Sequence, residues 1–185
     1  MVARTVTHRF TGEQVTFLET AEDTGGQYLL IEVSLPPHGD GPPLHSHLSF
    51  TEQFTVIAGT LTVRVEKSQR PLRSAQQALI VPGIKHTFSN KHDEPVTFQV
   101  QLTPPSQFEQ SMRIHYGLMD DGRTNAKGLP KNLFHLALIL SLQDTLVAGV
   151  PPRLQRMVLN GLVRLGRKTN AYVGLENYSG QPLIF

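Results

Sequence analysis

The segment "GDGPPLHSHLSFTEQFTVIAG", residues 39–59, places two histidines one residue apart in a chain that has only eight. Side chains at positions i and i+2 of an extended strand point to the same face, so His45 and His47 project together. Glu52 can join them only if "LSF" bends the chain and a new strand begins at "TEQFTVIAG". A buried carboxylate among apolar residues needs compensation, which a metal ion supplies. The segment therefore predicts two short strands around a metal site.

A further histidine, His86, follows a Pro-Gly turn in "VPGIKHTFSN", at the head of a short predicted strand. A sandwich of strands can bring it against the first pair. The candidate metal ligands are then three imidazoles and one carboxylate: His45, His47, Glu52 and His86. Such a set suits one divalent transition metal ion (Fe, Mn, Ni, Co, Cu or Zn) and leaves positions open on it, as catalysis requires.

Short segments rich in β-branched and aromatic residues flank this stretch. Apolar and polar residues alternate in most of them, as in strands with one buried face. They are "EQVTFLE" (13–19), "YLLIEVSL" (28–35), "EQFTVIA" (52–58), "TLTVRVE" (60–66), "QALIV" (77–81) and "VTFQVQL" (96–102). Prolines and turn residues lie between the segments, and no helical period interrupts them. The pattern predicts a mainly β protein, an antiparallel sandwich or barrel.

From Ser106 the hydrophobic period becomes helical. The sequence "SQFE" has the spacing of a capping box and predicts the start of a helix. A second helix is expected from about Pro130 to Val147, and a third begins at Pro151. Residues 170–185 are expected to be irregular or extended.

The third predicted helix carries an apolar stripe. Its members are Leu154, Met157, Val158, Gly161, Leu162 and Leu165. Because such a stripe has to be buried somewhere, the helices either cover the barrel mouth as a lid or form a dimer interface. We therefore divide the chain into a barrel, residues 1–105, and a helical C-terminal extension, residues 106–185.

Composition excludes several classes of protein. The chain has 185 residues, which fits one domain with an appendage, and no cysteine, which excludes disulfides and thiolate sites. Its net charge of +2 comes with no run of Lys and Arg, so we expect no nucleic-acid partner. The apolar run "LFHLALILSL" is too short for a membrane span, which needs roughly 20 residues. No apolar signal segment opens the sequence, so the expected location is cytoplasmic.

The spacing of the candidate ligands resembles the two motifs of the cupin superfamily. Every defined place of the first motif, G-x5-H-x-H-x3,4-E-x6-G, is filled by Gly39, His45, His47, Glu52 and Gly59. The second motif, G-x5-P-x-G-x2-H-x3-N, is matched at Gly83, His86 and Asn90. It departs at Ala75, where the leading glycine belongs, and at Pro82, which directly precedes Gly83. The resemblance covers residues from about 13 to 103 and leaves the helical extension without a family.

The resemblance implies a double-stranded β-helix, or jelly-roll, barrel of six to eight strands with a mononuclear metal site inside its mouth. The four matched positions would be its ligands. It also implies a small-molecule substrate or ligand and a homodimer, which cupins commonly form through barrel strands. The nearest functional analogy is to quercetinase-type dioxygenases.

Several functions stay open at this point. A metal-dependent enzyme acting on a small organic molecule is the leading reading, with a dioxygenase as its sharpest form. A metal-dependent isomerase or hydrolase follows. The alternatives from other classes are a non-enzymatic small-molecule-binding or sensing protein, and a storage or structural protein. A polar cluster that no longer binds metal is the structural alternative for the ligand set.

Other residues have two readings each. His38 lines the pocket mouth or lies on the surface, and His92 is a turn residue. The histidines at positions 8, 115 and 135 are expected on the surface or in packing. Phe50, Phe54, Phe88 and Phe98 either form an apolar pocket or fill the barrel, and either the apolar or the polar face of residues 96–102 points inward. Arg64 and Lys85 meet an anionic substrate or face solvent.

Overall fold

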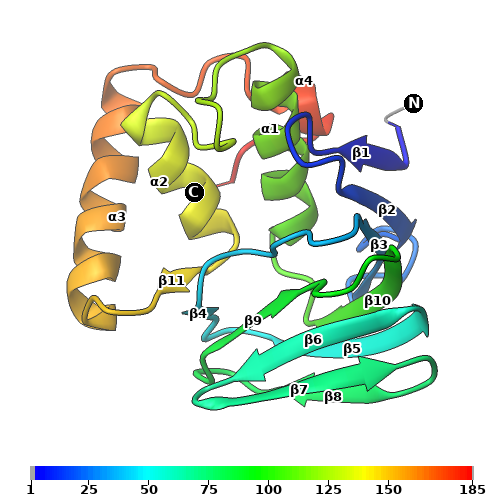
Figure 1. The fold of residues 1–185 in the computed structure, drawn as a ribbon. Helices are drawn as coiled ribbons and strands as arrows, with labels where there is room; N and C mark the ends of the chain where they lie inside the picture. Colours follow the sequence, from blue (N-terminus) through cyan, green and yellow to red (C-terminus); the bar gives the residue numbers. More distant parts are fainter. Residues whose placement is uncertain (1–2, 185) are drawn as a thin grey trace.

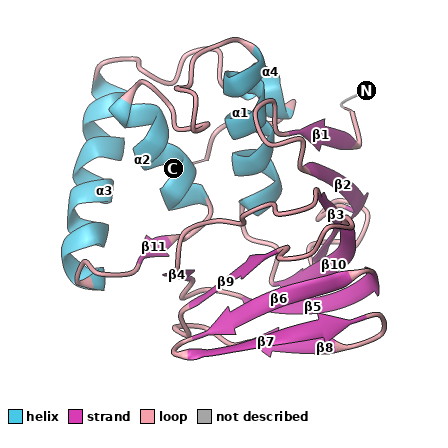
Figure 2. Ribbon diagram, in the orientation of Figure 1, coloured by secondary structure: helices cyan, strands magenta, loops and turns pink. Residues whose placement is uncertain are grey.

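Two antiparallel sheets form the β part of the molecule, and helices of the C-terminal part lie beside it (Figures 1 and 2). The computed structural model describes residues 3–184. The larger sheet has the order β1 (Thr5–Thr7), β2 (Gln14–Glu19), β3 (Leu29–Leu35), β10 (Val96–Thr103), β5 (Thr51–Ala58) and β8 (Gln77–Ile80). The smaller sheet has the order β11 (Leu146–Val147), β4 (His45–Ser46), β9 (His86–Ser89), β6 (Thr60–Val65) and β7 (Ser68–Arg73). This is the jelly-roll arrangement that the sequence predicts.

The alternation of each central strand decides which face is buried. In β10, Val96, Phe98, Val100 and Leu102 are buried, while Gln99 lies on the other face and donates to Glu32 of β3 (3.1 Å). The apolar alternative for residues 96–102 is therefore correct. The aromatic residues at 54, 88 and 98 pack on one another as ordinary barrel core, with ring centroids 5.1–6.1 Å apart.

Motif positions outside the ligand set lie in turns and loops of the barrel. Gly59, between β5 and β6, has φ +80°, and a Cβ there would lie 2.6 Å from the carbonyl oxygen of Pro95, so only glycine fits. Ala75, where the second motif has a glycine, has φ +65°. An alanine therefore occupies a left-handed conformation that glycine adopts at lower cost. Asn90 bridges two loops by donating to the carbonyl oxygens of Pro36 (3.0 Å) and Glu94 (2.8 Å).

Three long helices and one short one follow the barrel. They are α1 (Phe108–Asp120), α2 (Leu133–Leu142), α3 (Pro152–Lys168) and α4 (Glu176–Ser179). The predicted capping box is wrong: Ser106 has φ +49°, and α1 starts after Gln107 without a side-chain cap. The expected irregular end of the chain contains the short helix α4.

The second helix is shorter than the predicted span from 130 to 147. It starts after Asn132, whose side chain accepts a hydrogen bond from the Phe134 backbone amide (2.8 Å). It ends at Leu142, because Asp144 turns the chain with φ +49° and residues 146–147 form strand β11. No helix within residues 3–184 combines the length and the apolar character needed to cross a membrane.

Helix α1 joins the barrel core to a second core among the helices. Tyr116 and Met119 of α1 are buried in the barrel core, and the Tyr116 hydroxyl donates to Glu13 (2.7 Å). The Arg113 guanidinium lies over the Phe17 ring of β2, 4.1 Å from its centroid. The second core consists of Ile114, Leu118, Leu138, Ile139, Leu142, Tyr172 and Leu175. The largely apolar α2 contributes Leu138, Ile139 and Leu142 to this core and lies between α1 and α3 (Figure 1).

Candidate metal centre

Three segments of the barrel bring the four candidate ligands together. His45 in β4 lies directly opposite His86 in the antiparallel neighbour β9. His47 follows β4 on the same face, and Glu52 enters from β5 of the other sheet. All four side chains are buried, and one potential ligand atom from each lies within 4.8 Å of the others. The bend at "LSF" that the sequence requires is present between β4 and β5.

The ring nitrogens converge closely. His45 Nε2 and His47 Nε2 are 3.0 Å apart, and His86 Nε2 lies 2.6 Å from Glu52 Oε2. His47 Nε2 lies 3.7 Å from the same oxygen. These atoms bound one small volume between the two sheets.

Each ring is oriented by a backbone carbonyl on its outer side. The Nδ1 atoms of His45, His47 and His86 contact the carbonyl oxygens of Pro43 (2.8 Å), Gln143 (2.9 Å) and Ile84 (3.1 Å). A carbonyl oxygen can only accept, so each neutral imidazole carries its proton on Nδ1 and turns the lone pair of Nε2 inward. This is the outer hydrogen bonding that metal-ligating histidines require.

The donor set fits a cation. Glu52 Oε2 is buried and has no aligned hydrogen-bond donor among the described residues, although His86 Nε2 lies 2.6 Å away. Inward lone pairs of neighbouring imidazoles repel one another, and a buried carboxylate oxygen without a donor is costly. A metal ion bound by these atoms removes both costs. The four residues therefore suit one divalent transition metal ion.

Burial sets the charge states of these side chains. It lowers the pKa of His45 to about 4 and lowers the pKa of His47, so both imidazoles are neutral at pH 7. Burial raises the pKa of Glu52, but the neighbouring imidazoles lower it by more, and the carboxyl is ionised. Burial lowers the pKa of His86, but the Glu52 carboxylate outweighs this effect and raises it. Neutral imidazoles and an ionised carboxylate are the forms that bind metal, so His45, His47 and Glu52 are ready to do so, while a protonated His86 would release its proton to the solvent on binding.

A segment of the C-terminal extension also shapes the site. Strand β11 pairs with β4, placing Val147 opposite His45. The carbonyl oxygen of Gln143 orients His47, and the Asp144 carboxylate accepts from the backbone amide of Leu48 (2.6 Å). These contacts could not be predicted from the sequence, because nothing in residues 143–147 indicates that they lie beside residues 45–48 in the fold.

Aromatic rings cover the histidines. Phe50 stacks on His47 with ring centroids 4.4 Å apart, and Phe108 of α1 lies 6.4 Å from the same imidazole. Phe50 and Phe108 also contact each other edge to face. Met112, one turn further along α1, contacts the Gln143 side-chain amide (3.5 Å). The first turns of α1 therefore form an apolar cover next to the candidate ligands.

The other histidines stay outside the ligand cluster. His38 is exposed and pairs with Asp93 (2.9 Å), and His92 lies in an exposed turn. His115 contacts the carbonyl oxygen of Gly128 (2.8 Å), and buried His135 contacts that of Ala171 (2.9 Å). His8 packs edge to face on the Tyr116 ring.

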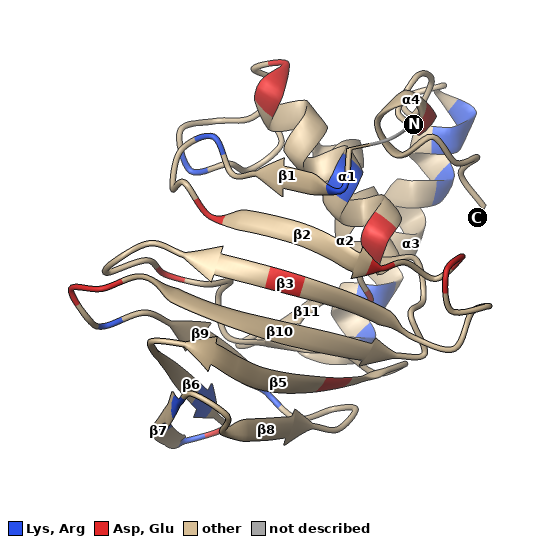
Figure 3. Cartoon of the chain, turned by 90° about the vertical axis from the view of Figure 1, so that its right-hand side faces the viewer, with Lys and Arg blue, Asp and Glu red and all other residues tan. Residues whose placement is uncertain are grey.

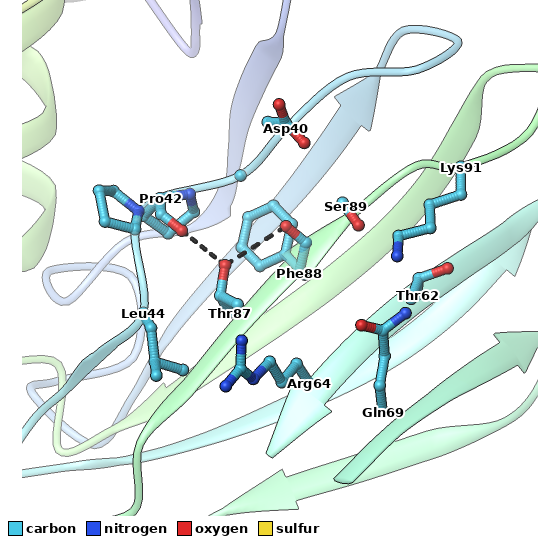
Figure 4. A pocket seen from close by; sticks show the side chains of 12 residues that line it. Asp40, Pro42, Leu44, Thr62, Arg64, Gln69, Thr87, Phe88, Ser89 and Lys91 are labelled. Carbon is cyan, nitrogen blue, oxygen red and sulfur yellow. Dashed lines mark hydrogen bonds between the residues drawn. The ribbon is translucent and has the colours of Figure 1, made fainter. Parts of the chain in front are cut away.

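Arg64 lies in a separate hollow of about 410 Å³, which none of the candidate ligands lines (Figure 4). Loop 40–44 and strands β6, β7 and β9 form its walls. Lys85 is not among the lining residues; its backbone amide donates to the Glu66 side chain (3.0 Å).

Comparison with known proteins finds a family match for part of the barrel. The family model described as "Cupin domain" matches residues 31–102. Similar solved structures include a sugar phosphate isomerase from a cupin superfamily of Silicibacter pomeroyi, with 25% identity over 52% of this chain and 62% of that chain, at a TM-score of 0.47. This chain thus spans less than two thirds of the isomerase.

Two further structures are similar at lower identity. A predicted oxalate decarboxylase from Thermotoga maritima has 16% identity over 56% of this chain and 93% of that chain, with a TM-score of 0.48. The polyketide cyclase RemF from Streptomyces resistomycificus has 18% identity over 55% and 73%, with a TM-score of 0.47. No protein of curated function matches the chain.

Proposed function

Residues 31–102 match the cupin domain family, and from this premise we propose that the chain is a cupin and a metal-dependent enzyme acting on a small organic molecule. One divalent transition metal ion would be held by His45, His47, Glu52 and His86. The observation that carries the proposal is the inward convergence of three Nε2 atoms beside a buried Glu52 oxygen that lacks an aligned donor. Storage or structural roles require neither feature.

The residues around the ligands have defined tasks in this proposal. The carbonyl oxygens of Pro43, Gln143 and Ile84 keep the protons of the three imidazoles on Nδ1. Phe50 and Phe108 pack against the ring of His47 and make its surroundings apolar. When bound, the ion supplies Lewis acidity or, if redox-active, chemistry with dioxygen.

We place a dioxygenase ahead of an isomerase or hydrolase. No fifth His, Asp or Glu within residues 3–184 belongs to the cluster, and on this ground we propose a reaction that needs no separate general base. A reaction that begins with proton abstraction would need one. An oxygenase that receives an already acidic substrate, such as an enol or a phenol, does not.

The experiment that tests the proposal is elemental analysis of protein purified without chelators or added metal. We expect about one transition metal ion per chain, lost in His47→Ala and Glu52→Ala. His92→Ala is the matched control, because its histidine is exposed. Equal metal content in all variants would reject the site. Oxygen uptake with flavonol, diketone and catechol panels then tests the dioxygenase, and zinc as the only bound metal would count against it.

The main alternative is a cupin that binds or senses a small molecule without turnover. It predicts a ligand-induced shift in melting temperature with no consumption of the ligand. The same panels therefore separate the two functions when shift and product formation are measured together.

We further propose that the extension, residues 106–185, acts with the barrel, residues 1–105, as the cover of the site. The contacts of Phe108 and Gln143 with His47 support this. A cytoplasmic homodimer without a nucleic-acid partner remains a prediction, for which the mass in solution and the location in cells are the measurements.

A further inference from the structure

Helix α3 exposes an apolar face. It is the outermost helix, on the far side of α2 from α1 (Figure 1). Four of its apolar side chains are exposed to solvent. Their exposed fractions are 46% for Leu154, 66% for Met157, 49% for Val158 and 49% for Leu165. Their spacing, i, i+3, i+4 and i+11, puts them on one side of the helix, with Gly161 between them. The stripe that the sequence analysis expected to be buried is therefore open to solvent.

The opposite face of α3 is already occupied. Leu159, Leu162 and Val163 are half-buried, and Gly166 is buried against the Tyr172 ring. The Gln155 side chain donates to the carbonyl oxygen of Val147 (2.7 Å) and accepts from its amide (3.0 Å). These contacts fix the rotation of α3 about its axis, so the exposed face cannot turn inward without breaking them.

The same segment is strongly basic. From Thr145 to Leu175 the sequence contains no Asp or Glu. It contains Arg153, Arg156, Arg164, Arg167 and Lys168, all in α3. Figure 3 shows positive charge along this helix. At 100° per residue Arg153, Arg164 and Lys168 flank the apolar face, while Arg156 and Arg167 lie further round the helix. Valines 147, 150 and 173, at the two ends of the helix, are also exposed.

We propose that this face of α3 binds the surface of an anionic lipid bilayer, with the helix lying parallel to the membrane. Aliphatic side chains can enter the acyl boundary without leaving a polar group unpaired, while Arg and Lys side chains reach the headgroups. A second copy of α3 is disfavoured as the occupant, because it would bring its own cations close to those of the first copy. The proposal concerns binding on the membrane and is independent of the metal site.

Co-sedimentation of the full chain with lipid vesicles tests this proposal. We expect binding to vesicles of phosphatidylcholine mixed with phosphatidylserine, at least tenfold weaker binding to phosphatidylcholine alone, and release by salt. Met157→Gln should weaken binding to the anionic vesicles about tenfold, because an apolar side chain no longer enters the bilayer. The double variant Arg153→Gln/Arg164→Gln should weaken it by a similar factor.

Leu79→Gln is the matched control, since Leu79 is equally exposed (62%) but lies in β8. It should bind as the unmodified chain does, and metal content and circular dichroism should be unchanged in all variants. Absent binding, equal binding to neutral vesicles, or an equal loss in Leu79→Gln would overturn the proposal. So would a dimer that Met157→Gln dissociates, which assigns the face to a second copy, or binding of polyglutamate without binding of vesicles, which assigns it to an acidic protein.

Discussion

The carbonyl oxygen of Gln143 contacts Nδ1 of His47 at 2.9 Å, across 96 residues of sequence. This hydrogen bond ties a candidate metal ligand in the barrel to the loop that follows α2. One residue further on, Asp144 binds the backbone amide of Leu48 at 2.6 Å. The orientation of His47 therefore depends on the C-terminal extension as well as on the barrel.

Replacing Asp144 should weaken metal binding without removing a ligand. Asp144→Gly deletes the carboxylate that holds Leu48 but tolerates the local φ of +49°. We expect about a tenfold loss of affinity, the lower end for outer contacts of a metal-binding histidine, measured by competition with a chromogenic chelator. Asn170→Gly, at another left-handed position (φ +55°) far from the candidate ligands in sequence, is the control and should not change affinity. A similar loss in both would contradict the role of Asp144.

Metal should stabilise the folded chain through Glu52. A ligand that binds only the folded state adds about 2.7 kcal/mol at one hundred times its dissociation constant, so the metal should raise Tm. Glu52→Gln should lower the Tm of the chelator-treated protein, because the neighbouring imidazoles that lower the pKa of Glu52 favour its ionised form in the folded chain, and should abolish the gain from metal. Differential scanning calorimetry with and without metal measures both effects. A metal-dependent gain that survives in Glu52→Gln would rule out this carboxylate as a ligand.

Replacing Ala75 by glycine should stabilise the folded chain. A left-handed φ of +65° costs a residue with a Cβ roughly 1–2 kcal/mol, while the added chain entropy of glycine costs roughly 0.5–1 kcal/mol. Ala75→Gly should therefore increase the free energy of unfolding by about 0.5–1 kcal/mol in urea titrations. Ala78→Gly, in the neighbouring strand β8, should instead lower it. A loss of stability in Ala75→Gly would show that the alanine is not strained.

The contact between Glu13 and Tyr116 should make stability depend on pH. Burial raises the pKa of Glu13, and the hydrogen bond from Tyr116 offsets this only in part. A carboxyl whose pKa is higher in the folded than in the unfolded chain costs stability as pH rises through its unfolded value, because the folded state holds the proton more tightly. Glu13→Gln should therefore gain more stability at pH 7 than at pH 4 in urea titrations. The same change at both pH values would contradict the raised pKa.

Much of the fold could be predicted from local patterns in the sequence. Alternation in "VTFQVQL" identified β10 as a strand, and the positions of His45 and His47 one residue apart placed both on one face. The Pro-Gly turn before His86 also appears as expected: Gly83 has φ +86°, and its amide donates to the carbonyl oxygen of His47 (2.6 Å). Periodicity and turn residues report such features because they depend on neighbours a few positions away.

The tertiary structure alone decided the rest. The helical period after residue 142 gave way to strand β11, because residues 146–147 find an open edge at β4 that no local signal describes. The apolar stripe of α3 predicted that a face is buried, but α2 and Tyr172 took the other side of the helix. The sequence by itself determined the strands and predicted the gathering of four candidate ligands, while the inward face of residues 96–102 was decided by the structure. Which distant carbonyl orients His47, and which helix face stays open, depended on packing between segments that the chain brings together only when folded.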